Sequence, residues 1–61
     1  MTLPEAITYA LVRCNGGLRT EQIAALINRY QWHVTSAQVY ATIMRYPAQF
    51  CKAEGRIMLM I

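Results

Sequence analysis

Helix start and stop signals recur along this short chain and limit what it can fold into. Thr2 is followed three positions later by Glu5, which is typical of a capping box at the start of a helix, and Pro4 suits the first turn. The run NGG at 15–17 would end that helix, because glycine accepts the positive φ found there. The sequence therefore predicts a first helix within residues 2–14.

Two further cap signals predict two more helices. Thr20 is expected to be the N-cap of a helix over about 21–30. The Thr-Ser pair at 35–36 predicts the start of a third helix over about 37–46, and Pro47 ends it, because the residue before proline avoids helical geometry. Each predicted helix has an apolar stripe at helical spacing: Leu3, Ile7, Ala10, Leu11 and Cys14, then Ile23, Leu26, Ile27 and Tyr30, then Val39, Ile43 and Tyr46.

Two apolar runs near the C-terminal end predict a β-hairpin. They are QFCKA at 49–53 and RIMLMI at 56–61, and the residues between them are Glu54 and Gly55. A glycine in a two-residue connection favours a tight turn. Leu18, after the first helix, could supply a minimal third strand.

The hairpin loop also fixes which residues face each other. With Glu54 and Gly55 in the loop, Phe50 faces Leu59 and Ile57 lies on the same side. We expect that side to close the core.

Length and composition indicate one domain with apolar surface to spare. The chain has 61 residues, of which 56% are hydrophobic, so a single domain over 1–61 has more apolar side chains than one small core can bury. Six Lys and Arg against three acidic residues give a net charge of +3, a mild preference for anionic partners. We therefore expect part of the apolar surface to contact a partner.

The order helix, short strand, helix, helix, strand, strand resembles a winged helix-turn-helix domain. The resemblance rests on the passage INRYQWHVTSAQVYATI between the second and third helices and on the hairpin after YPAQF. Within that superfamily, EQIAALINR, SAQVYATI, RYPAQF and EGRIMLMI are similar to the HARE-HTH type, found in restriction-linked and chromatin proteins. The resemblance implies a small α+β fold, a three-helix cluster with a C-terminal hairpin wing, and a DNA-binding or DNA-associated module of the kind that regulates transcription.

In a helix-turn-helix, the second helix of the pair enters the major groove. The predicted helix at 37–46 has that place. Gln38 on its outward side can pair with adenine, and basic side chains there and on the 50–59 hairpin can hold phosphates. We predict that double-stranded DNA is contacted by Thr20, Ser36, Ala37, Gln38, Tyr40, Ala41, Arg45, Lys52 and Arg56.

Other interpretations of the same residues stay open. Gln38 and Arg45 fit an ordinary solvated helix face equally well, and Lys52 and Arg56 fit a charged hairpin edge that resists pairing. A second hypothesis is a protein-interaction or homodimerisation domain without direct DNA binding. Its interface would include Met44, Met58 and Met60. A homodimer or a larger protein complex would also supply the DNA affinity that three phosphate contacts alone do not.

The composition gives little support for enzyme chemistry. One His, no Asp and three Glu make an acid-base pair hard to assemble. Cys14, His33 and Cys51 lack the paired spacing of a zinc site, and no glycine-rich phosphate loop is visible. We expect no enzyme activity, cofactor, metal site or membrane span. We expect reduced cysteines and a cytoplasmic protein, associated with the nucleoid if bacterial.

Overall fold

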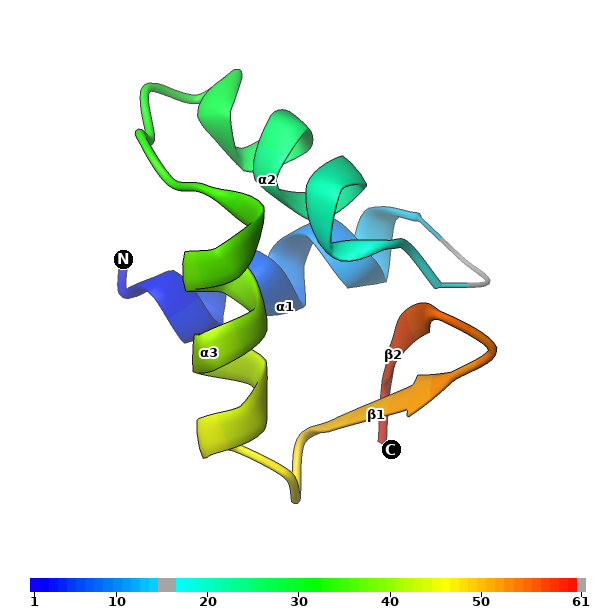
Figure 1. The fold of residues 1–61 in the computed structure, drawn as a ribbon. Helices are drawn as coiled ribbons and strands as arrows, with labels where there is room; N and C mark the ends of the chain where they lie inside the picture. The colour runs from blue at the N-terminus through cyan, green and yellow to red at the C-terminus, as the bar shows by residue number, and fades with distance from the viewer. Residues whose placement is uncertain (15–16, 61) are drawn as a thin grey trace.

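Three helices precede a two-stranded antiparallel hairpin in the computed structural model, which describes residues 1–14 and 17–60 (Figure 1). Helix α1 packs against α2, α3 and β2, and α2 packs against α3. The architecture is therefore a small α+β fold in the predicted order. The elements are α1 (Leu3–Arg13), α2 (Thr20–Asn28), α3 (Ser36–Arg45), β1 (Phe50–Ala53) and β2 (Arg56–Leu59). The predicted stop signal at 15–16 lies outside the described residues.

Helices α1 and α3 begin with reciprocal capping boxes. The Thr2 hydroxyl accepts the Glu5 backbone N–H at 3.4 Å, and Glu5 Oε1 accepts the Thr2 backbone N–H at 2.7 Å. The same two bonds join Thr35 and Gln38, at 3.1 and 2.8 Å. The cap signals predicted at both helix starts are confirmed, and each box pairs two backbone amides that have no partner within the helix.

Helix α2 begins and ends earlier than its sequence pattern predicts. Its N-cap is Arg19, and Thr20 is already helical, so the prediction that Thr20 is the N-cap is wrong. Gln22 explains the shift, because its Oε1 accepts the Arg19 backbone N–H at 2.9 Å and fixes the cap one residue upstream. The helix then stops at Asn28 rather than near residue 30.

The Asn28 side chain forms two hydrogen bonds across the connection between α2 and α3. Its Nδ2 donates to the Val34 carbonyl and its Oδ1 accepts the Val34 N–H, both at 2.9 Å. Gln31 between them has a φ of 72°, which lets the chain reverse. Trp32 and Val34 are thereby packed, partly buried, against the core.

The core is drawn from all three helices and both strands. Two predicted members are wrong: Tyr30 is 60% exposed and Tyr46 is 39% exposed. Each lies just past the end of a helix, so it leaves the stripe that its spacing would have continued. The buried residues are Ala6, Ile7, Ala10, Leu11, Ile23, Ala24, Ile27, Val39, Ile43, Phe50 and Ile57.

The hairpin has the predicted register. Phe50 pairs with Leu59, and Ile57 is buried on the same side. Both loop residues, Glu54 and Gly55, have positive φ, at 55° and 78°, as in the mirror-image turns that match strand twist.

Leu18 forms a single isolated bridge to Ile57 where the sequence predicts a minimal third strand, and the sheet in the described residues has two strands. The Leu18 N–H donates to the Ile57 carbonyl at 3.1 Å, and its carbonyl accepts the Ile57 N–H at 2.7 Å. The α1–α2 connection is thus fastened to the edge of β2. Gly17 just before it has a φ of 90° and lies against Met58, which leaves that side chain half-buried.

Candidate nucleic-acid interface

Helix α3 has one buried and one open side. Val39 and Ile43 are 0% and 1% exposed and pack into the core. Ser36 is half-buried at the N-terminal end. The exposed residues are Ala37, Gln38, Tyr40, Ala41, Met44 and Arg45, which include the other α3 residues predicted to contact DNA. The two-sided helix that the spacing predicts is therefore present.

Gln38 already has a structural role at the start of α3. Its Oε1 accepts the Thr35 backbone N–H at 2.8 Å. Pairing with adenine through two hydrogen bonds uses both the carbonyl and the amide group of glutamine. The capping bond uses one of the two lone pairs of Oε1 and fixes the side-chain orientation, so pairing with a base through both groups has to fit the orientation that the cap sets.

Lys52 of β1 links the hairpin to the open side of α3. Its Nζ lies 5.1 Å from the centroid of the Tyr40 ring, within cation–π range. Tyr40 keeps 40% of its surface exposed. The ammonium group therefore lies beside the α3 surface that the sequence assigns to DNA.

The remaining basic candidates are spread more widely. Arg45 is exposed in the last turn of α3. Arg56 pairs with Ala53, and because adjacent cross-strand pairs alternate in direction, it lies on the hairpin face opposite to Lys52. It runs beside Gly17 instead. The structure brings Lys52 and Tyr40 together but does not bring Arg56 to them, and Thr20 is half-buried in the first turn of α2.

The methionines predicted as a protein interface differ in exposure. Met44 and Met60 are 50% and 54% exposed. Met58 is half-buried and lies against Gly17. Tyr46, which the pattern places in the core, joins this exposed apolar set instead.

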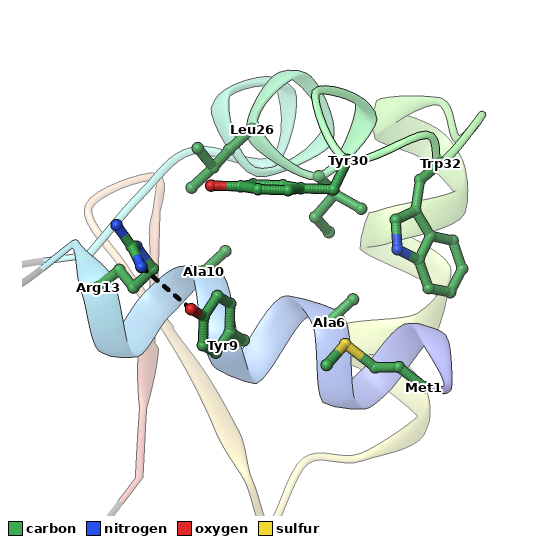
Figure 2. A pocket seen from close by; sticks show the side chains of 9 residues that line it. Met1, Ala6, Tyr9, Ala10, Arg13, Leu26, Tyr30 and Trp32 are labelled. Carbon is green, nitrogen blue, oxygen red and sulfur yellow. Dashed lines mark hydrogen bonds between the residues drawn. The ribbon is translucent and has the colours of Figure 1, made fainter.

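A pocket between α1 and α2 was not anticipated from the sequence (Figure 2). Its volume is about 490 Å³. At one end, Arg13 Nη1 donates to Tyr9 Oη at 3.0 Å, and this hydrogen bond raises the pKa of Arg13. The i, i+4 spacing of Tyr9 and Arg13 on α1 was the available signal. The lining residues are Met1, Ala6, Tyr9, Ala10, Arg13, Leu26, Ile27, Tyr30 and Trp32.

Over residues 1–14 and 17–60, no three His, Cys, Asp or Glu side chains gather as a metal site would need. Within the same ranges, none of the helices has the length and apolar character to cross a bilayer. Cys14 and Cys51 are free thiols, both half-buried.

No family model, curated protein or solved structure matches this chain.

Proposed function

We propose that this domain is a winged helix-turn-helix module that binds double-stranded DNA, with α3 in the major groove and the hairpin on the flanking backbone. The observation that carries the proposal is the 5.1 Å contact between Lys52 Nζ and the Tyr40 ring, because it sets a hairpin cation beside the open side of α3. The net charge of +3 supports an anionic partner.

The residues proposed to contact DNA divide into those that reach base edges and those that hold phosphates. Ala37 and Ala41 are small and exposed, so the helix backbone can approach the bases and a methyl group can meet a thymine methyl. The Gln38 Nε2 amide adds a hydrogen-bond donor group. Arg45 and Lys52 would hold phosphates and set the position of the helix.

Charge placement sets the expected salt dependence. If Arg45 and Lys52 each neutralise one phosphate, the slope of log affinity against log salt is about −1.8, and a contribution from Arg56 on the other hairpin face makes it about −2.7. With so few phosphate contacts, we expect one copy of the domain to bind DNA weakly. A dimer or a second DNA-binding element would raise the affinity.

Fluorescence anisotropy with mixed-sequence duplexes at low salt tests the proposal. We expect Arg45→Gln and Lys52→Gln each to weaken binding and to reduce the salt slope by about 0.9. Arg29→Gln is the matched control, because it removes the same charge from the end of α2. Absence of binding at tens of micromolar protein, or equal weakening by the control, would contradict the proposal.

A second candidate function is supported by exposed apolar side chains. Tyr40, Met44, Tyr46 and Met60 are each between 39% and 54% exposed, which favours a protein-interaction or homodimerisation domain. Sedimentation over a range of concentrations tests it. Self-association that Met44→Gln reduces, in a protein that does not bind DNA, would favour this candidate over the first.

A further inference from the structure

The α1–α2 pocket has a polar end and an apolar body. Figure 2 shows the Tyr30 ring above α1, with its hydroxyl on the Arg13 side of the pocket. Tyr9 and Arg13 lie at that same end, joined by their hydrogen bond. Met1 and Trp32 lie toward the other end. The other lining residues are apolar: Ala6, Ala10, Leu26 and Ile27.

Arg13 gives the polar end an uncompensated positive charge. The Tyr9 hydroxyl accepts one of its hydrogen bonds and orients the guanidinium, but it is not a carboxylate and forms no salt bridge with it. A guanidinium has five N–H donors in a planar fork, which suits a carboxylate. Arg13 is the one ionised side chain among the described lining residues, so a ligand's acid group would find a cation there and no competing carboxylate.

We infer that this pocket binds a small hydrophobic monocarboxylate, with its hydrocarbon body between α1 and α2 and its carboxylate against Arg13 and the Tyr9 and Tyr30 hydroxyls. None of the lining residues belongs to α3 or to the hairpin. The site is therefore separate from the proposed DNA surface.

The size of the pocket favours a small molecule over a macromolecule. Its volume of about 490 Å³ falls in the range of roughly 300–1,000 Å³ that is usual for small-ligand sites. A stable protein interface covers about 800 Å² on each partner, a large share of the 4298 Å² surface of this chain. An apolar wall with a guanidinium at one end is an arrangement that can hold and orient a single amphiphile.

Titration with octanoate, in parallel with the neutral 1-octanol, tests the inference. Trp32 is the single tryptophan of the chain and lines the pocket, so its fluorescence reports binding. We expect a saturable change with octanoate, tighter than with octanol by roughly three- to tenfold, as one charge-assisted pair in a partly exposed site gives. Amide NMR shifts should concentrate at Ala6, Ala10 and Leu26.

Matched variants separate the two parts of the site. Arg13→Gln should bring octanoate down to the affinity of octanol and leave octanol unchanged, while Arg13→Lys retains part of the preference. Arg29→Gln removes an arginine that does not line this pocket and should change neither affinity. Tyr30→Ala removes an exposed wall residue and should weaken both ligands.

Three outcomes would overturn the inference. Equal binding of octanoate and octanol, with no effect of Arg13→Gln, would show that the pocket does not recognise a carboxylate. NMR shifts centred away from the α1–α2 pocket would show that the ligand binds elsewhere. A Trp32 signal that changes with protein concentration before any ligand is added would show that a second copy of the chain occupies the pocket.

Discussion

At the scale of single residues, the hairpin turn holds Glu54 in a backbone conformation that is unfavourable for glutamate. Glu54 has a φ of 55°, a region that asparagine adopts more readily than glutamate. We expect Glu54→Asn to raise the free energy of unfolding by about 0.5–1 kcal/mol, measured by urea denaturation. Glu54→Gln is the control, because it removes the charge and keeps the backbone preference. A gain of equal size from Gln would assign the effect to charge.

The capping carboxylate of Glu5 makes part of the stability pH-dependent. The hydrogen bond from the Thr2 backbone N–H is the largest of the causes that lower the pKa of Glu5 below its usual value of 4.5. A lowered pKa in the folded state means that the stabilisation is complete above the unfolded value and is lost as the pH falls through the folded one. We expect the melting temperature of Glu5→Gln to fall less than that of the wild type on going from pH 5 to about pH 3. Parallel curves would contradict this.

At the scale of elements, one side chain determines how α2 is joined to α3. Asn28 makes two hydrogen bonds to Val34, and at about 0.5–1.5 kcal/mol each their loss in Asn28→Ala should lower the free energy of unfolding by about 1–3 kcal/mol. Asn28→Asp keeps the acceptor and loses the donor, so it should fall between alanine and the wild type. Urea denaturation followed by Trp32 fluorescence measures the stability of both variants. An unchanged midpoint for Asn28→Ala would refute a stabilising role of the Asn28–Val34 hydrogen bonds.

Elements were predictable wherever the signals were local. Cap residues three positions apart and two-residue turns act within one turn of chain, so the starts of α1 and α3 and the hairpin register followed from the sequence. The hydrogen bonds from Asn28 to Val34 join residues six positions apart and depend on the positive φ of Gln31. Neither feature can be deduced from the apolar periodicity. For that reason the spacing predicts Tyr30 in the core, where a longer α2 would place it.

The candidate sites divide in the same way. The open side of α3 followed from helical spacing alone. The positions of Lys52 and Arg56 on opposite hairpin faces follow from the pairing register, but the contact from Lys52 to Tyr40 depends on how the hairpin docks against α3. The i, i+4 spacing of Tyr9 and Arg13 indicates only that these two side chains meet, whereas the α1–α2 pocket also needs Met1, Tyr30 and Trp32 to come together in space.

At the scale of the whole molecule, the core is small enough that one residue can decide whether the domain folds. Ile57 is 1% exposed, is bonded through its backbone to Leu18, and lies on β2, which packs against α1. Replacing a buried isoleucine by alanine costs about 2–5 kcal/mol. A domain of this length has about 3–9 kcal/mol in total, at roughly 0.05–0.15 kcal/mol per residue.

Ile57→Ala should therefore unfold a measurable fraction of the protein at room temperature, whereas Ile57→Val, at about 0.5–1.5 kcal/mol, should stay folded. The physical reason extends beyond β2, because the same cluster includes residues of all three helices and the partly buried Trp32. Loss of Ile57 should thus shift the Trp32 fluorescence transition and the far-UV circular dichroism transition together. If the helical signal of Ile57→Ala kept the wild-type midpoint while the hairpin melted, the helices would be stable without the hairpin. In that case Lys52 would be held beside Tyr40 only weakly, and the DNA surface would depend on α3 alone.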